Sequence, residues 1–314
     1  MSRILITGAG MVGCHVARAL ADDRHDPVFF DASPRVDYIR RVTGHDVEVL
    51  HGDLRDLTTV VEAVNRVRPA AVVHTAALIG EAAQVVPHRG FEVNVVGSVN
   101  VAEAVRLAGV PRLLHASTIG VNDLSQPQDA PLAETFPIAS GGRIYGASKV
   151  ACEQLLWAYS RAYGFELGLL RFAGIYGLGH FAGGSGIGPE ILGLVRAAID
   201  GVPARLGTGM PASYEIVHVK DVARGVARAA TVATLPHHIY NLGQGVLVEP
   251  ADVLAAAGRV FPGFSGEAAM PRPDLHPRRQ PLDLTRSRAE LGYEPAFTLE
   301  TGLLDLAEEL RVGC

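Results

Sequence analysis

The chain has 314 residues, 48% of them apolar, and a formal net charge of −5 at pH 7. This length and composition allow a large buried core and more than one structural unit. No cluster of Lys and Arg provides a basic surface. The sequence therefore argues against nucleic acid and against a membrane as partners.

Cys14, Cys152 and Cys314 lie far apart in the sequence, without the spacing of a metal site or a redox pair, which is typical of reduced thiols. The chain passes directly from Met1 into an apolar segment and a glycine turn, and no run of 18 apolar residues follows. A signal peptide and a membrane-spanning helix are therefore not predicted. We expect a cytoplasmic protein without a bound metal.

Short apolar runs alternate with segments of helical periodicity over roughly the first half of the chain, a pattern typical of βαβ units. Each expected strand is apolar enough to be buried on both faces of a parallel sheet; the strands are 4–7, 28–30, 47–50, 71–74, 112–116 and 166–170. The expected helices are 12–21, 58–67, 92–108 and 145–163, and Gly109 and Gly164 are expected to end two of them. The sequence thus predicts an α/β fold with a doubly wound parallel sheet.

The pattern changes after the sixth strand, because residues 174–209 are rich in Gly and Pro and shorter, mixed elements follow up to an amphipathic segment at 299–310. We expect one domain over residues 1–173, with later segments around 211–245 returning to it. Residues 174–314 are expected to form mainly a smaller, interleaved substrate-binding cap.

A GxGxxG turn follows the first strand and opens the first helix. In a Rossmann fold the first glycine allows the tight turn, the second lets the backbone approach a pyrophosphate, and the third lets helix and sheet pack closely. The helix N-terminus offers unpaired N–H groups to the phosphates. The sequence therefore predicts a dinucleotide site that includes Gly8, Gly10, Met11, Val12 and Gly13.

Asp31 ends the second strand, 18 residues after Gly13. A carboxylate at this place accepts hydrogen bonds from the hydroxyls of the adenosine ribose and repels a 2′-phosphate. NAD is therefore favoured over NADP, although Arg35 is near enough in the sequence to offset the repulsion.

Tyr145 and Lys149 are four residues apart and so share one face of one helix. A tyrosine with an ordinary pKa of about 10 is a poor base at neutral pH unless positive charge stabilises its phenolate. Lys149 and an oxidised nicotinamide ring would both supply that charge. A phenol tuned in this way can take a proton from a hydroxyl as hydride leaves its carbon, or return it in the reverse direction.

With these motifs the sequence resembles the extended short-chain dehydrogenase/reductase family, whose members are often called NAD-dependent epimerases/dehydratases. The resemblance covers nearly the whole chain. Besides the glycine turn and the Tyr145/Lys149 pair, the matching segments are 52–54 (GDL), 73–77 (VHTAA), 91–100, 115–118 (HAST), 170–177 (LRFAGIYG), 217–223 (VHVKDVA) and 291–295 (LGYEP).

The resemblance implies further residues that contact or shape the bound cofactor. They are Asp53, which would hydrogen-bond the adenine, Leu54 beside it, Ala76 and Leu78 after the fourth strand, Asn94 on the nicotinamide side, and Ala173 after the sixth strand.

Thr118 occupies the family's catalytic Ser/Thr position, where its hydroxyl would hydrogen-bond the reacting oxygen of the substrate. Ser117 is its neighbour and nearest rival, and Gly174 replaces an asparagine that often contacts a sugar. We expect all three residues to border the substrate. His74 and His115 lie in or beside apolar strands and are expected to be structural.

Positions at which this chain departs from the family pattern reduce the number of candidate reactions and substrates. Family dehydratases place an acidic pair directly after the catalytic Thr, and related decarboxylases a Glu, whereas this chain has Ile119 and Gly120. This argues against elimination of water and leaves dehydrogenation, or epimerisation by oxidation, rotation and re-reduction. Residues 212–216 lack the Arg that usually holds a diphosphate, which weakens a nucleotide-sugar substrate and leaves room for a polyol, sugar acid or hydroxy acid.

Two other regions are candidates to border the substrate. Residues 179–188 form either a lid or a plain surface loop. Arg272, Arg278 and Arg279 stand where the family often places an anion-binding Arg, and each is either such a contact or solvated surface charge.

The sequence therefore predicts an NAD-dependent oxidoreductase that transfers hydride at a secondary alcohol of a sugar, sugar acid or similar small hydroxy compound. Thr118 would position the hydroxyl, Tyr145 would accept its proton, and Lys149 would lower the Tyr145 pKa and hold the nicotinamide ribose. Two alternatives stay open: an NAD-retaining epimerase of a sugar or nucleotide sugar, and a non-catalytic NAD-binding regulator. The helices at 92–108 and 145–163 correspond to those that pair in family dimers, so we expect a homodimer.

Overall fold

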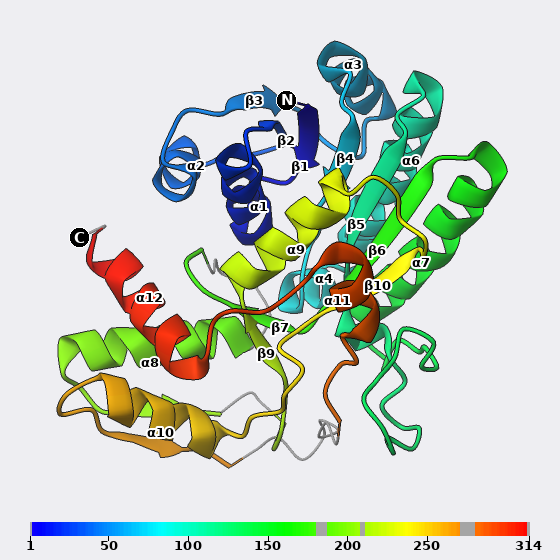
Figure 1. The fold of residues 1–314 in the computed structure, drawn as a ribbon. Helices are drawn as coiled ribbons and strands as arrows, with labels where there is room; N and C mark the ends of the chain where they lie inside the picture. Colours follow the sequence, from blue (N-terminus) through cyan, green and yellow to red (C-terminus); the bar gives the residue numbers. More distant parts are fainter. Residues whose placement is uncertain (1, 180–186, 208–210, 271–279, 313–314) are drawn as a thin grey trace.

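A seven-stranded parallel sheet forms the centre of the molecule, with the strand order β10-β6-β5-β4-β1-β2-β3 (Figure 1). The computed structural model describes residues 2–179, 187–207, 211–270 and 280–312. The strands are β1 (Arg3–Thr7), β2 (Asp26–Asp31), β3 (Glu48–His51), β4 (Ala71–His74), β5 (Arg112–Thr118), β6 (Glu166–Phe172) and β10 (Ile239–Leu242). All six strands expected from the apolar runs are present, and the predicted doubly wound fold is confirmed.

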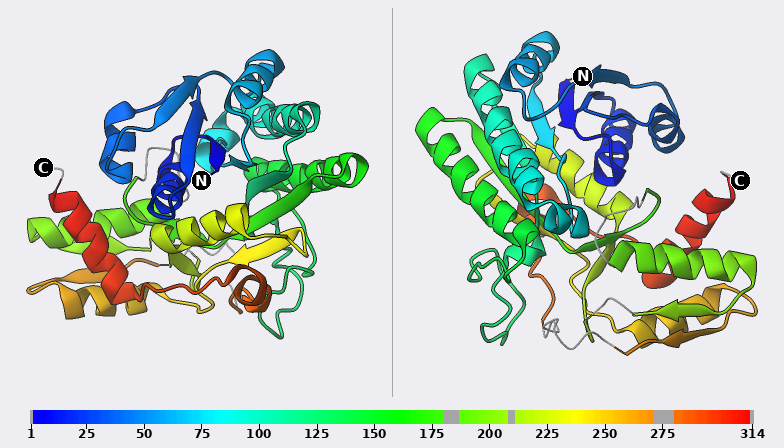
Figure 2. Two further views of the ribbon diagram at one scale, coloured as in Figure 1. Left: turned by 45° about the horizontal axis from the view of Figure 1, so that its top comes forward. Right: turned by 180° about the vertical axis from the view of Figure 1, so that it is seen from behind.

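Helices cover both faces of this sheet (Figures 1 and 2). The helices on one face are α1 (Met11–Asp22) and α9 (Val219–Thr231), and those on the other are α3 (Leu57–Val67), α6 (Gly97–Ala108) and α7 (Ile144–Tyr163). Ile4 and Ile6 of β1 enter the first core and Leu5 enters the second. This alternation is the two-residue period of a strand buried on both sides.

The helix ends agree with the glycine signals. Gly109 and Gly164 follow α6 and α7 with φ values of 64° and 80°, the left-handed conformation expected there. A π-helical turn, Glu92–Val96, precedes α6, and α2 (Val36–Thr43) lies between β2 and β3 although the sequence analysis did not predict it. Within the described segments, no helix has the length and apolar character needed to cross a bilayer.

The C-terminal part contains a smaller layer, which we call the cap. It consists of α8 (Ile187–Asp200), β8 (Ala204–Leu206), α10 (Pro250–Val260), β11 (Gly266–Ala268) and α12 (Leu299–Arg311). Its helices lie together below the sheet in Figure 1, and α12 contacts both α8 and α10. Short elements complete the chain: α4 (Glu81–Val85), α5 (Pro87–Phe91), the 3-10 turn η2 (Ile119–Val121) and α11 (Thr285–Leu291).

The chain crosses between sheet and cap more than once. β7 (Gly174–Tyr176) follows β6 directly and pairs with β9 (Ile216–His218), which lies beyond α8 and β8 in the sequence. After β9 the chain forms α9 on the sheet and then β10, which pairs with β6. It then enters the cap again at α10.

Candidate active site

A cavity of about 1170 Å³ lies at the carboxyl ends of the central strands. Its lining comes from the ends of β1, β2, β4, β5 and β6 and from the cap side, as shown by Gly10, Asp31, Ala76, Thr118, Ala173, Ile187 and Tyr214. The strand order reverses between β4 and β1, and doubly wound sheets bind ligands at such a switch point. The topology therefore places the candidate site here.

The glycine turn after β1 leaves room for a pyrophosphate. A Cβ on Gly13 would lie 2.0 Å from the carbonyl oxygen of Gly8, so only glycine lets α1 come this close to the turn. At Gly10 a Cβ would meet no atom within 4 Å, and Gly10 caps α1 without a side-chain hydrogen bond. Open space beside the N-terminal amides of a helix fits a phosphate group. The turn thus fits the dinucleotide that the sequence predicts.

The carboxylate of Asp31 borders the cavity in a fixed orientation. One oxygen accepts a hydrogen bond from the Ala9 amide at 2.8 Å, and the other accepts one from the Ser33 amide at 2.7 Å. The guanidinium of Arg35 lies 5.9 Å from the centre of the Tyr38 ring, and Arg35 does not line the cavity. The place expected for the adenosine ribose therefore carries a carboxylate, which favours NAD.

Asp53 and Leu54 line the same end of the cavity, together with Arg55, which the sequence analysis did not identify. Arg55 donates to both carboxylate oxygens of Asp53, with a shortest distance of 2.6 Å. These hydrogen bonds hold the pKa of Asp53 below its usual range. Asp53 is therefore a fixed acceptor at the expected adenine position.

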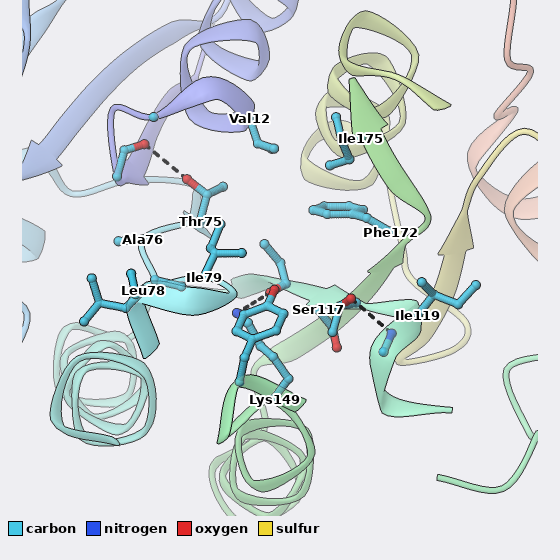
Figure 3. Close-up of a pocket in the computed structure, with 18 of the residues that line it drawn as sticks. Val12, Thr75, Ala76, Leu78, Ile79, Ser117, Ile119, Lys149, Phe172 and Ile175 are labelled. Atoms are coloured by element: carbon cyan, nitrogen blue, oxygen red, sulfur yellow. Dashed lines mark hydrogen bonds between the residues drawn. The ribbon is translucent and has the colours of Figure 1, made fainter. Parts of the chain in front are cut away.

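Asn94 is buried and does not line the cavity, but it contacts a residue that does, Leu78. Its side chain accepts a hydrogen bond from the Leu78 amide at 2.7 Å and donates to the Leu78 carbonyl at 2.9 Å. It also donates to the Ser148 hydroxyl at 3.1 Å. Asn94 thus ties the cavity-lining loop after β4 to α7, while Ala76 and Leu78 themselves face the cavity (Figure 3).

Thr118, Tyr145 and Lys149 come together where β5 meets the start of α7, and all three line the cavity. The Tyr145 phenol forms a hydrogen bond with Thr118. The Lys149 Nζ lies 5.9 Å from the centre of the Tyr145 ring. The structure therefore assembles the set that the sequence predicts from its spacing and from the family resemblance.

Burial dominates the electrostatics of this set. It raises the pKa of Tyr145, and the hydrogen bond with Thr118 opposes that rise only in part. Burial also lowers the pKa of Lys149, whose Nζ donates to the Ala116 carbonyl at 2.6 Å and lies 3.4 Å from Nε2 of His115. His115 is fully buried and its pKa is lowered well below the usual value, so it stays neutral beside the ammonium group.

The residues expected at the substrate have different surroundings. Gly174 lines the cavity, and a Cβ there would lie 2.8 Å from the Ile187 Cδ1. Ser117 also lines the cavity but is buried, and its hydroxyl donates to Glu153 at 2.5 Å. Its role as a substrate contact remains a prediction, made less direct by that hydrogen bond.

An apolar wall on the cap side was not identified from the sequence. It consists of Phe172, Ile175 and Ile187, next to Tyr214, and Figure 3 shows Phe172 and Ile175 across the cavity from Leu78. Residues 180–186, Arg272, Arg278 and Arg279 lie outside the described residues, so the predictions of a lid and of an anion-binding arginine stay predictions.

A Rossmann sheet with a phosphate-binding glycine turn and a Thr–Tyr–Lys set in one cavity defines the class of NAD-dependent enzymes that move a hydride at an alcohol carbon. Within this class, the chain belongs to the NAD dependent epimerase/dehydratase family, whose model matches residues 4–243. The predicted family is thereby confirmed.

Relatives extend over the whole chain. The UDP-glucose 4-epimerase of Mycolicibacterium smegmatis is 30% identical over 321 residues, covering 98% of each chain. The crystal structure of the Thermus thermophilus UDP-glucose 4-epimerase in complex with NAD has 28% identity and a TM-score of 0.83, covering 98% of this chain and 99% of that one. MoeE5 in complex with UDP-glucuronic acid and NAD has 25% identity and a TM-score of 0.83, covering 99% of this chain and 100% of that one. The cofactor is NAD, as the sequence predicts.

Proposed function

We propose that this enzyme is an epimerase that oxidises a secondary alcohol of a sugar and re-reduces the ketone on its other face, with NAD retained. The meeting of Thr118, Tyr145 and Lys149 in the cavity carries the proposal, because this set can move one proton in both directions. Relatives named UDP-glucose 4-epimerase favour epimerisation over net oxidation and make a UDP-linked sugar the first substrate class to test.

In this mechanism the protein handles the proton. Thr118 hydrogen-bonds the reacting hydroxyl, and Tyr145 takes its proton during oxidation and returns it during reduction. Lys149 stabilises the phenolate with its positive charge and holds the nicotinamide ribose. Bound NAD supplies the hydride acceptor of the first half and the donor of the second. Ile119 and Gly120 stand where family dehydratases carry an acidic pair, which argues against elimination of water.

Net dehydrogenation is the second candidate, supported by the cap side of the cavity. Tyr214 stands within residues 212–216, where the family usually has a diphosphate-binding Arg, and lies beside the apolar wall. This wall suits a smaller hydroxy compound better than a diphosphate.

The test incubates the purified enzyme with UDP-glucose, and separately with free sugars, sugar acids and polyols in the presence of NAD. Proton NMR follows the product stereochemistry, and absorbance follows NADH. Formation of UDP-galactose without net NADH supports the epimerase. Stoichiometric NADH assigns a dehydrogenase instead, and NAD binding with no turnover of any of these compounds contradicts both candidate reactions on them.

We also propose that the protein is a homodimer joined through α6 and α7. These helices expose large apolar side chains at Leu107, Leu155 and Tyr163, and the Arg106 guanidinium of α6 lies 5.0 Å from the centre of the Tyr163 ring of α7. Exposed apolar surface of this kind favours association. A monomeric mass in sedimentation would contradict the proposal.

A cytoplasmic location is also a proposal. Cys14 and Cys152 are buried and unpaired, and burial raises the pKa of Cys14 to about 12, which keeps it an unreactive thiol. Thiol labelling of the protein taken directly from cells measures whether these cysteines are reduced there.

A further inference from the structure

A buried ion pair lies directly behind the catalytic set. Arg171 of β6 donates to both carboxylate oxygens of Glu153 on α7, at 3.0 Å from Nε and 2.7 Å from Nη2. Both side chains are only 2% exposed. Removing two charges from water costs several kcal/mol per ion, so a buried pair is weak evidence for stability. Because this desolvation cost makes a gain in stability a poor explanation for the pair, a role of Glu153 and Arg171 in the reaction explains it better.

The pair connects every element that carries a predicted catalytic group. Glu153 follows Tyr145 and Lys149 at the same spacing of four, so it continues their face of α7 by one turn. The Ser117 hydroxyl, next to Thr118 on β5, donates to Glu153 at 2.5 Å. Arg171 also donates to the Glu134 carbonyl at 3.0 Å and lies two residues before Ala173. One carboxylate thus joins α7, β5 and β6 next to Ser117, which lines the cavity.

We propose that Glu153 and Arg171 are positioning residues for the reaction: their buried ion pair holds α7 against β5 and β6 so that Tyr145 and Lys149 face Thr118. This inference rests on the proton-transfer roles given above, which make the relative placement of these groups decisive. A misplacement of about 1 Å can cost about 100-fold in rate.

The charge of Glu153 adds to this effect. Lys149 is surrounded by the neutral His115 from β5 and His74 from β4, by Cys152 on its own helix and by the Tyr145 ring. Burial lowers the Lys149 pKa, and the nearby negative charge of Glu153 opposes this. Glu153 therefore helps to keep Lys149 charged, as the phenolate of Tyr145 requires.

The test replaces the pair with apolar residues of similar size in the double variant Glu153→Leu/Arg171→Met, since such replacements often preserve stability. The control is Arg112→Met/Glu166→Leu, a less buried pair whose Arg112 also donates to the carbonyls of Ala229, Val232 and Ala233. This pair, 2.5 Å apart, joins β5 and β6 at their opposite ends. We expect kcat to fall at least about 10-fold in the first variant, with KM for the sugar substrate within about 2-fold, and to stay near wild type in the control.

A second readout needs no substrate. Ultraviolet titration of the NAD-loaded protein, minus the same protein carrying Tyr145→Phe, reports ionisation of Tyr145. We expect its pKa to rise by about one unit or more in Glu153→Leu/Arg171→Met and not in the control. Glu153→Gln, which keeps the size of the side chain and an acceptor for Ser117, should show the same direction and carries the test if the double variant does not fold.

An unchanged Tyr145 pKa in Glu153→Leu/Arg171→Met, or an equal change in the control, overturns the positioning role. If the wild type turns over none of the compounds tested, the epimerase proposal fails by itself, because the titration still decides whether the pair positions Tyr145.

Discussion

Burial and a hydrogen bond act on the Tyr145 phenol in opposite directions. Burial, the larger effect, raises its pKa, and the contact with Thr118 lowers it. The protonated phenol is therefore the resting form at neutral pH, ready to donate a proton during reduction. Its work as a base depends on positive charge supplied by Lys149 and the oxidised cofactor.

Replacing Tyr145 with Phe removes this proton carrier and keeps the ring. We expect turnover to fall at least about 100-fold, because that is the usual contribution of general acid–base catalysis. NAD binding and the circular dichroism spectrum should not change. Tyr159→Phe is the control, since Tyr159 lies on the same helix, packs beside Tyr163 and does not line the cavity. Near-normal turnover of Tyr145→Phe would refute the role of the phenol.

Residues with a local signal could be predicted from the sequence. The spacing of four residues predicted Tyr145 and Lys149 as site residues. The glycine turn and Asp31 were predicted as cofactor contacts because each follows an expected strand. Glu153 and Arg171 were not singled out, because the sequence shows two ordinary charged residues. Only the packing of α7 on β5 and β6 reveals that they meet.

The turn between β1 and α1 needs glycine at two positions for two different reasons. Gly13 allows the helix to approach the turn, whereas the place of a Cβ at Gly10 is open space bordering the cavity. A substitution at Gly13 should therefore affect stability, and a substitution at Gly10 should affect cofactor binding.

Gly13→Ala should lower the free energy of unfolding by at least about 1–3 kcal/mol, since its Cβ would overlap the Gly8 carbonyl. Gly10→Ala should leave stability nearly unchanged and weaken NAD binding about 10-fold or more, because the methyl group occupies room needed by the pyrophosphate. Urea unfolding and calorimetry measure the two effects. Equal loss of stability in both variants would contradict this separation.

Element boundaries show where apolar patterns stop being informative. The expected strands at 112–116 and 166–170 each extend two residues further, into Ser117–Thr118 and Arg171–Phe172, because Ser117 pairs with Arg171 and Thr118 with Phe172 in the β5–β6 ladder. Ser117, Thr118 and Arg171 are polar, so the apolar run ends before them and before Phe172, although the ladder continues. The short α2 was missed because its eight residues span only about two turns, too few for a helical period to stand out in the sequence.

Buried histidines make the stability of the whole molecule depend on pH. Burial lowers the pKa of His15 to about 4 and those of His74 and His218 to about 3. Between these values and the ordinary pKa of about 6.5, the unfolded chain binds protons that the folded protein does not bind. Stability therefore falls as the pH decreases through this window, by up to about 1.4 kcal/mol per pH unit for each histidine.

Urea unfolding across this window should show a shallower pH dependence for His74→Gln than for the wild type, by about one proton. His74 is fully buried between the hydroxyls of Thr7 and Ser98, at 2.6 Å and 2.9 Å. His88→Gln is the control, because the His88 side chain is 84% exposed. Identical slopes for the two variants would show that His74 is not the source.

The repeated crossing between sheet and cap limits how such a molecule can acquire a new substrate. The segments of the cap are separated by α9 and β10, and β10 is the strand beside β6. No single continuous stretch can be transplanted to bring a foreign cap along. Changes of substrate preference must therefore come through individual substitutions on the cavity wall. A hybrid made by exchanging everything after β7 would also replace β10, the strand at the edge of the central sheet.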